Sequence, residues 1–143
     1  KYLIERKDIV SKQIEKLNES KKQNELNNSH VEPQKENITY DDFSKMDIRL
    51  GTILSAEKVA KTKKLLKLTI DTGIDKRTIV SGIAEYYKPE EIIGKQVVVL
   101  VNLQAKELKG IESQGMILMA ENLNKELSFV LPEKKFRDGS LVK

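Results

Sequence analysis

Apolar and polar positions change their periodicity along this chain of 143 residues. Residues 1–17 have apolar side chains at the spacing of one helix face, which predicts an amphipathic helix that needs a packing partner. The side chains of this stripe are those of Leu3, Val10, Ile14 and Leu17. Residues 18–38 are rich in Asn, Lys, Glu, Gln and Ser, a composition too polar to bury a core, and therefore predict a flexible linker.

From residue 39 onward the period is that of β-strands. Apolar and polar residues alternate over 48–57, and an uninterrupted apolar run at 97–101 predicts a buried strand. The predicted strands are residues 48–57, 66–71, 77–80, 97–101, 116–120 and 127–131. Pro89 and the two glutamates after it are typical of a first helical turn, so one helix is predicted over 84–93. Short strands with a helix between the third and the fourth predict an all-β, five-stranded Greek-key barrel of the OB type, with an open sandwich as the alternative.

Composition narrows the chemistry that such a fold can support. The chain has no cysteine and one histidine, which excludes disulfides, thiolate metal sites and zinc clusters that need two histidines. That residue, His30, falls in the predicted linker, where we expect a solvated side chain. We therefore expect a non-catalytic segment without a cofactor. No apolar run is long enough to span a bilayer, and we expect a soluble, cytoplasmic protein.

Positive charge gathers in one loop, although the formal net charge is only +4. Five lysines fall within ten residues between the first two predicted strands, at Lys58, Lys61, Lys63, Lys64 and Lys67. In an OB barrel this loop borders the binding face, where cations can follow a phosphate backbone; a solvated lysine loop is the alternative. A second segment, 102–116, combines Lys106 and Lys109 with amide and hydroxyl donors that suit phosphates and riboses. Aromatic residues make up only 5% of the chain, so a folded RNA read through its shape and backbone is favoured over a stacked single strand.

Five ordered blocks of the sequence closely resemble a known family. These blocks are residues 43–51, 64–66, 77–83, 87–91 and 102–116. Together they resemble the tRNA-binding domain at the C-terminus of bacterial methionyl-tRNA synthetases, and they are similar to a free-standing structure-specific tRNA-binding protein and to the endothelial-monocyte-activating polypeptide. The resemblance covers residues 39–143, while residues 1–17 look like the last helix of the synthetase body. We therefore expect this chain to be the tail of a longer protein, with the sites for ATP and methionine elsewhere.

The resemblance implies an OB barrel with a C-terminal β extension, which dimerises and holds the outer corner of tRNA without reading the anticodon. It implies neither a membrane nor DNA as a partner. Ser113 and Met116 fall where the family contacts tRNA, although a methionine that begins an apolar strand is also a common core residue. The other candidate tRNA-binding residues are Lys58, Lys61, Lys63, Lys64, Arg77, Asn102, Lys106 and Lys109.

Two departures from the family pattern shift the expected binding surface. Glu107 stands in a stretch that is usually more basic and should weaken phosphate attraction there, whereas Lys63 replaces a usual acid. The surface should therefore lean toward the first loop. The alternative function is that of a dimeric export chaperone for unfolded polypeptides, because such a chaperone shares this fold and several of the same blocks.

Overall fold

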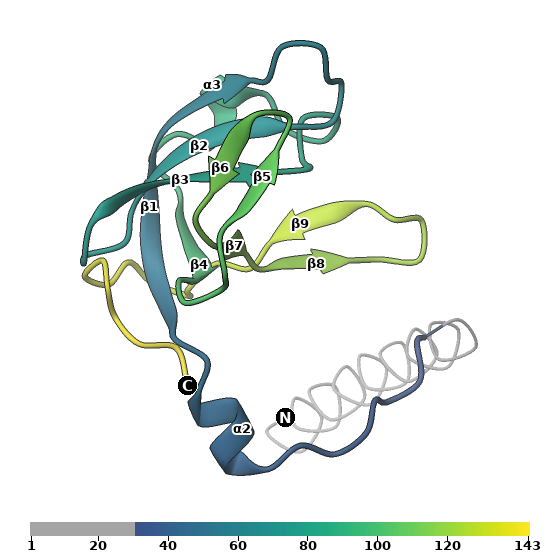
Figure 1. Ribbon diagram of the computed structural model, residues 1–143, viewed down its shortest axis with the longest axis vertical. Coiled ribbons are helices and arrows are strands. Elements are labelled where there is room, and N and C mark those ends of the chain that lie inside the picture. The colour runs from purple at the N-terminus through teal and green to yellow at the C-terminus, as the bar shows by residue number, and fades with distance from the viewer. Residues whose placement is uncertain (1–30) are drawn as a thin grey trace, which may run out of the picture. The chain divides into compact units, whose positions relative to one another are not determined.

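Antiparallel strands form the body of the computed structural model, which describes residues 31–143 (Figure 1). The helix expected over 1–17 and the first part of the expected linker lie outside these residues. Residues 31–39 contain neither helix nor strand, and Asn37–Lys143 form one compact unit. No helix within the described residues is long and apolar enough to cross a membrane.

Five strands make one sheet in the order β3-β2-β1-β4-β7. They are β1 (Ile48–Lys58), β2 (Leu66–Asp71), β3 (Lys76–Ser81), β4 (Gln96–Leu100) and β7 (Met116–Ile117). The sheet curls so far that its two outer strands meet: the Gln114 N–H, just before β7, donates to the Thr78 carbonyl of β3 at 2.8 Å. The predicted five-stranded barrel is therefore confirmed, and the open sandwich is wrong.

The long first strand changes partners in its middle, and this lets the sheet curl. Thr52 stands opposite Gln96 of β4 on one side and Asp71 of β2 on the other, and a β-bulge follows between Ile53 and Ser55. At the crossing an added Cβ on Gly51 would lie 2.8 Å from the Ile70 Cγ2, so only glycine fits there without a shift. The alternation expected over 48–57 does not mark one interior face of this strand: Ile53 lies in the barrel interior, whereas Ile48 and Leu50 belong to a second cluster and Leu54 is 41% exposed.

Apolar side chains fill the barrel and also cover part of its outside. The interior cluster consists of Ile53, Leu66, Leu68, Ile70, Ile79, Ile83, Ile92, Val97, Val99, Val101, Ile117 and Phe129. A smaller outer cluster forms around Ile48, Leu50 and Val98. Because β4 contributes to both clusters, its run of consecutive valines is buried on both faces, as the sequence predicts.

The predicted helix over 84–93 is too long. The structure has α3 over Pro89–Ile92 and only a turn at 84–86. Pro89 explains the difference, because the residue before a proline is driven to an extended conformation, and Lys88 has φ −83° and ψ 145°. A further short helix, α2 (Tyr40–Ser44), was not predicted; the Thr39 side chain caps it by accepting from the Asp42 N–H at 3.1 Å.

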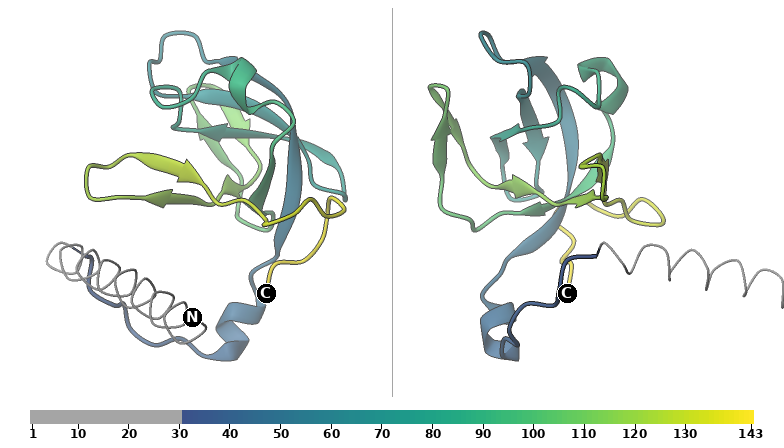
Figure 2. Two further views of the ribbon diagram at one scale, coloured as in Figure 1. Left: turned by 180° about the vertical axis from the view of Figure 1, so that it is seen from behind. Right: turned by 90° about the vertical axis from the view of Figure 1, so that its right-hand side faces the viewer.

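Two hairpins lie outside the five-stranded sheet (Figures 1 and 2), although one residue of each, Ser113 and Phe129, is buried against it. The first pairs β5 (Lys106–Leu108) with β6 (Ile111–Ser113), and the second pairs β8 (Met119–Glu121) with β9 (Leu127–Phe129). The predicted strand over 116–120 is thus wrong as one element, since its residues belong to two sheets. The C-terminal segment returns to β1, where the Leu50 N–H donates to the Ser140 carbonyl at 2.9 Å.

Candidate nucleic-acid interface

The loop that joins β1 to β2 has a fixed backbone. Val59 is buried and its N–H donates to the Leu65 carbonyl at 3.2 Å, while the Thr62 hydroxyl donates to the Val59 carbonyl at 3.1 Å. The Lys64 carbonyl in turn accepts from the Ala84 N–H at 3.0 Å. These contacts hold the loop against the barrel and leave its long side chains free to point outward.

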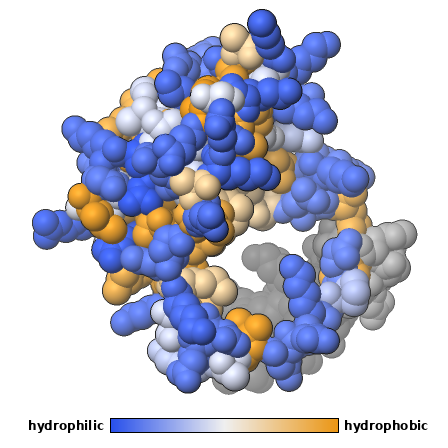
Figure 3. All heavy atoms as spheres, viewed as in Figure 1, coloured by the Kyte–Doolittle hydropathy of each residue, from blue (hydrophilic) through white to orange (hydrophobic). Residues whose placement is uncertain are grey.

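Four lysines of this loop make up one cationic surface, and we call Lys58, Lys61, Lys63 and Lys64 the loop lysines. All four are exposed, and none forms an ion pair within residues 31–143. The fifth lysine of the segment, Lys67, differs because its Nζ lies 3.5 Å from a Glu57 carboxylate oxygen. Hydrophilic side chains cover much of this end of the molecule (Figure 3). The structure therefore brings together the cations that the sequence singled out.

The β5–β6 hairpin carries charges of both signs. Lys109 and Gly110 form its two-residue turn with φ of 52° and 81°, and a turn with both residues in the left-handed region matches the twist of a hairpin. Lys106 and Lys109 are exposed, as a phosphate contact requires. Glu107 lies directly opposite Glu112, and both side chains are exposed, so two carboxylates share one face of the hairpin. This arrangement supports the expectation that Glu107 weakens phosphate attraction here.

Ser113 and Met116 occupy opposite environments. The Ser113 side chain is only 4% exposed; its hydroxyl accepts from the Val80 N–H at 2.9 Å and is 3.3 Å from the Gly115 carbonyl, to which it donates. Met116 is 43% exposed on β7, so its interpretation as a core residue is wrong. The methionine is available to a ligand, whereas the serine hydroxyl serves the barrel.

Arg77 also serves the fold. Its side chain is 15% exposed, and the guanidinium donates to both carboxylate oxygens of Asp75 at 2.9 and 3.0 Å. It donates further to the carbonyls of Val101 at 2.7 Å and Gln114 at 3.0 Å. The hydrogen bond from Arg77 is the main reason why the pKa of Asp75 lies below its ordinary value. Arg77 thus links β3 to the chain segments after β4 and before β7.

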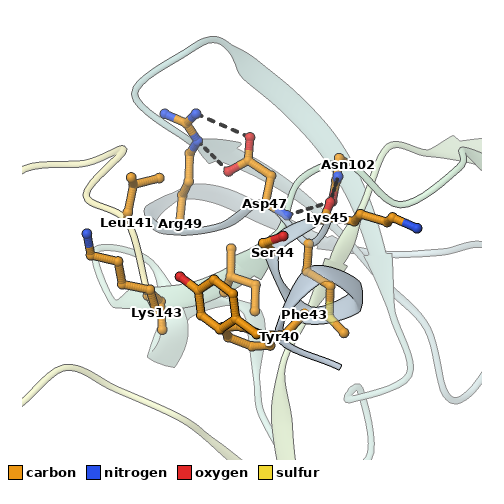
Figure 4. A pocket seen from close by; sticks show the side chains of 12 residues that line it. Tyr40, Phe43, Ser44, Lys45, Asp47, Arg49, Asn102, Leu141 and Lys143 are labelled. Atoms are coloured by element: carbon orange, nitrogen blue, oxygen red, sulfur yellow. Dashed lines mark hydrogen bonds and ion pairs between the residues drawn. The ribbon is translucent and has the colours of Figure 1, made fainter. Parts of the chain in front are cut away.

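Asn102 has a comparable structural task (Figure 4). Its side-chain oxygen accepts from the Asp47 N–H at 2.9 Å, and its side-chain nitrogen donates to the Lys45 carbonyl at 2.6 Å. It therefore holds the junction of α2 and β1 against the end of β4. For both Asn102 and Arg77, a role toward tRNA stays a prediction.

A hollow of about 460 Å³ lies beside this junction, between α2 and the C-terminal end of the chain (Figure 4). Its wall includes the Arg49–Asp47 ion pair, in which Nε and Oδ1 are 2.8 Å apart, and hydrogen bonding to Asp47 raises the pKa of Arg49. Exposed apolar side chains surround the pair, namely Tyr40, Met46, Leu141 and Val142. The sequence did not predict this hollow, because residues about 100 positions apart build it.

Metal coordination has no candidate residues in the described part of the chain. No group of three or more His, Cys, Asp or Glu side chains lies close enough together in residues 31–143 to hold an ion.

The barrel and its cationic first loop define a class, that of OB-fold nucleic-acid-binding domains. Residues 48–140 match the family model described as "Putative tRNA binding domain", and the chain belongs to this family. The resemblance seen in the five sequence blocks is thereby confirmed.

Curated relatives share this sequence at high identity. The chain is 58% identical over 133 residues to the methionine–tRNA ligase of Cytophaga hutchinsonii, which covers 93% of this chain and 19% of that protein. It is 61% identical over 124 residues to the enzyme of the same name from Flavobacterium psychrophilum, covering 87% of this chain and 18% of that protein. The chain therefore spans about a fifth of the length of these relatives.

Solved structures agree with the fold. A MetRS-related protein from Pyrococcus horikoshii superimposes with a TM-score of 0.72 at 38% identity, covering 76% of this chain and all of that one. The chaperone CsaA from Bacillus anthracis superimposes with a TM-score of 0.69 at 26% identity, with the same coverage. Both support the OB-type barrel.

Proposed function

We propose that this chain is the tRNA-binding module of a methionyl-tRNA synthetase. The loop lysines carry the proposal, because they are exposed, unpaired within the described residues and mounted on a fixed loop of a tRNA-binding family domain. The parent enzyme is inferred from the names of the curated relatives, which are methionine–tRNA ligases. In this proposal the module is not catalytic, and ATP, methionine and the aminoacylation machinery belong to the rest of the synthetase.

The proposed mechanism is electrostatic. Lysine ammonium groups are compact charges on flexible stems, so they bind phosphates without distinguishing bases. The module would therefore hold the backbone at the outer corner of tRNA, leave the anticodon unread and raise the affinity of the whole enzyme. We propose residues 1–17 as the last helix of the synthetase body, 18–38 as the linker, 39–143 as the binding domain and the cytoplasm as its location.

Titration with bulk tRNA at several salt concentrations tests this function. If four to six phosphates are neutralised, the logarithm of affinity should fall against the logarithm of salt concentration with a slope of roughly −3 to −5. A double-stranded DNA of similar length serves as the comparison and should bind more weakly. A response that does not depend on salt would contradict the electrostatic mechanism.

We further propose that two copies pair, which doubles the surface offered to tRNA. The hollow beside α2 supports this, because Tyr40, Met46 and Leu141 expose apolar area that a second copy would cover. Light scattering after size exclusion should give a dimer mass for the natural chain. Leu141→Asp should give a monomer, whereas Leu123→Asp, at an equally exposed leucine of the β8–β9 turn, should not. A monomeric natural chain would contradict the proposal.

A second candidate function is that of a chaperone for unfolded polypeptides. It is favoured by the likeness to two solved CsaA chaperones, at 26% and 29% identity. Titration with a permanently unfolded protein, such as reduced and carboxymethylated lactalbumin, separates the two functions. Saturable binding of tRNA without binding of the polypeptide supports the tRNA module, and the reverse result supports the chaperone.

A further inference from the structure

A second basic segment lies near the C-terminus, and no sequence block of the tRNA-binding resemblance includes it. Residues 133–137 follow β9, and we call them the C-terminal basic loop. Lys134, Lys135 and Arg137 are exposed, and none of them forms an ion pair within residues 31–143. Between them Phe136 is 53% exposed, which is unusual for a large aromatic side chain.

The backbone of this loop is held in place. The side chain of Gln96, a residue that is only 7% exposed, donates to the Phe136 carbonyl at 2.6 Å and accepts from the Phe136 N–H at 2.9 Å. The next acid, Asp138, accepts from the Thr52 hydroxyl at 2.6 Å and from the Gln96 amide at 3.0 Å. The phenyl ring is therefore displayed to solvent from a backbone fixed by buried polar contacts, and the ring itself makes no contribution to that anchoring.

A hollow of about 250 Å³ is lined in part by the residues just before Phe136. Its walls are built by Gly94, Lys95, Gln96, Leu131, Pro132, Glu133, Lys134 and Lys135. Three lysines and one carboxylate thus line the hollow, and the Nζ of one of them, Lys95, lies 5.9 and 5.8 Å from the ring centroids of Tyr87 and Phe129. Lys134 connects the hollow to the aromatic side chain, because its Nζ lies 5.7 Å from the centroid of the Phe136 ring. An anion bound by Lys134 would therefore lie close to a flat group stacked on the ring.

An exposed aromatic ring beside lysine ammonium groups suits the binding of unpaired nucleotides. An aromatic ring stacks on the face of a base, and neighbouring cations hold the phosphates on either side of it. The loop lies at the opposite end of β2 from the loop lysines, since Gly139 packs against Thr72 and Gly73 just after β2. The six residues of β2 span about 20 Å, a length that one RNA strand covers in a few nucleotides. A single RNA can therefore extend from one surface to the other.

We propose that the C-terminal basic loop is a second RNA-binding site, which takes an unpaired nucleotide of tRNA with its base on Phe136 and a phosphate held by Lys134 and Lys135. The identity of the RNA rests on the proposed function, whereas the stacking of a base on the ring does not. The first surface would then bind backbone alone, and the second would require a base that has left the stack.

Binding of an unstructured RNA of twelve uridines tests the second site directly, with an RNA duplex of the same length as the comparison. Phe136→Ala should weaken binding of the single strand roughly tenfold, and Phe136→Tyr should preserve it, because the tyrosine ring still stacks. Leu123→Ala, which removes an equally exposed side chain from the β8–β9 turn, should leave affinity unchanged. The affinity for the duplex should not respond to any of these changes.

The phosphate contacts are tested by Lys134→Ala combined with Lys135→Ala. The salt slope for the single strand should fall by about 1 to 2, and a matched loss of charge through Lys88→Ala and Lys125→Asn should not change it. If Phe136→Ala keeps full affinity for both the single strand and tRNA, the proposal of a second site is overturned and the proposed tRNA-binding function is unaffected. If the protein binds the single strand but does not bind tRNA, the proposed function is contradicted and the second site is not. Conversion of a dimer to a monomer by Phe136→Ala would assign the ring to a protein interface and overturn the second site.

Discussion

The Ser113 hydroxyl closes the barrel by accepting a hydrogen bond from the Val80 N–H at 2.9 Å. Ser113 is the last residue of β6, and its side chain gives an acceptor to β3, the strand at the edge of the five-stranded sheet. The two ends of segment 113–116 therefore differ in exposure and in role. Its first residue is buried to complete the barrel, and its last, Met116, is exposed on the surface.

Ser113→Ala should therefore act on stability. The substitution leaves the buried Val80 N–H without a partner, which costs about 1–3 kcal/mol in the free energy of unfolding. Urea denaturation should show a lower midpoint, while Ser55→Ala, at an exposed serine of β1, should not. At a temperature where the variant remains folded, its affinity for tRNA should stay within about twofold of the natural chain. Lost affinity with unchanged stability would assign the hydroxyl to tRNA instead.

Arg77→Lys should lower stability although it keeps the charge. The guanidinium makes four hydrogen bonds, two to Asp75 and one each to the carbonyls of Val101 and Gln114, and an ammonium group cannot reproduce this planar fork. We expect a loss of about 2 kcal/mol, measured as a lower melting temperature by circular dichroism. Arg137→Lys is the matched control at an exposed arginine and should melt like the natural chain. An unchanged melting temperature in Arg77→Lys would be inconsistent with the structural role.

The same ion pair makes part of the stability depend on pH. Because Arg77 lowers the pKa of Asp75 below its ordinary value of 3.8, the folded state favours the charged carboxylate more than the unfolded state does. The ion pair contributes its full stability above the ordinary pKa of Asp75, and this stability is lost as the pH falls through the lowered pKa of the folded state. The difference in unfolding free energy between the natural chain and Asp75→Asn should thus be constant near neutral pH and shrink below about pH 4. A difference that persists unchanged in strong acid would contradict this origin.

The loop lysines should dominate the affinity for tRNA. Replacing Lys58, Lys61, Lys63 and Lys64 by Ala should weaken binding at least roughly tenfold near 0.1 M salt and reduce the salt slope by about 3. The control replaces four other exposed lysines and changes the net charge equally; its residues are Lys35, Lys76, Lys88 and Lys125. Fluorescence titration with several purified tRNAs should show a uniform loss. A loss restricted to one tRNA would indicate that bases are read.

Removing the carboxylates of the β5–β6 hairpin should improve binding. Glu107 and Glu112 lie opposite each other on one face, so Glu107→Gln with Glu112→Gln relieves repulsion both between them and toward phosphates. Affinity for tRNA at low salt should rise roughly two- to fivefold, and the gain should vanish at high salt because exposed charges are screened. The matched control, Glu121→Gln with Glu126→Gln, changes the other hairpin. If both pairs raise affinity equally, net charge alone is responsible.

The periodicity of apolar residues predicted the strands that are long enough to bury several side chains. In β2 apolar residues face the barrel interior at every second position, and in β4 successive valines are buried, so the apolar pattern of each of these strands follows from its burial. The β5–β6 hairpin was missed because its strands are three residues long and mostly exposed, and therefore carry no apolar alternation. The helix over 84–93 was overextended because the restraint of Pro89 on Lys88 outweighed the helical character of the segment.

The family, the barrel and the cationic first loop were predictable from the amino-acid sequence, since they depend on local spacing and on residues adjacent in the chain. The candidate residues that are free to bind could be identified only from the folded structure. Arg77, Asn102 and Ser113 hydrogen-bond to groups 24 to 57 positions away, so their accessibility depends on how distant strands meet. The same holds for Phe136, whose display depends on Gln96, 40 positions earlier. The sequence does not show whether a polar side chain faces solvent or bonds to a distant carbonyl, because that depends on which segments meet in the folded chain.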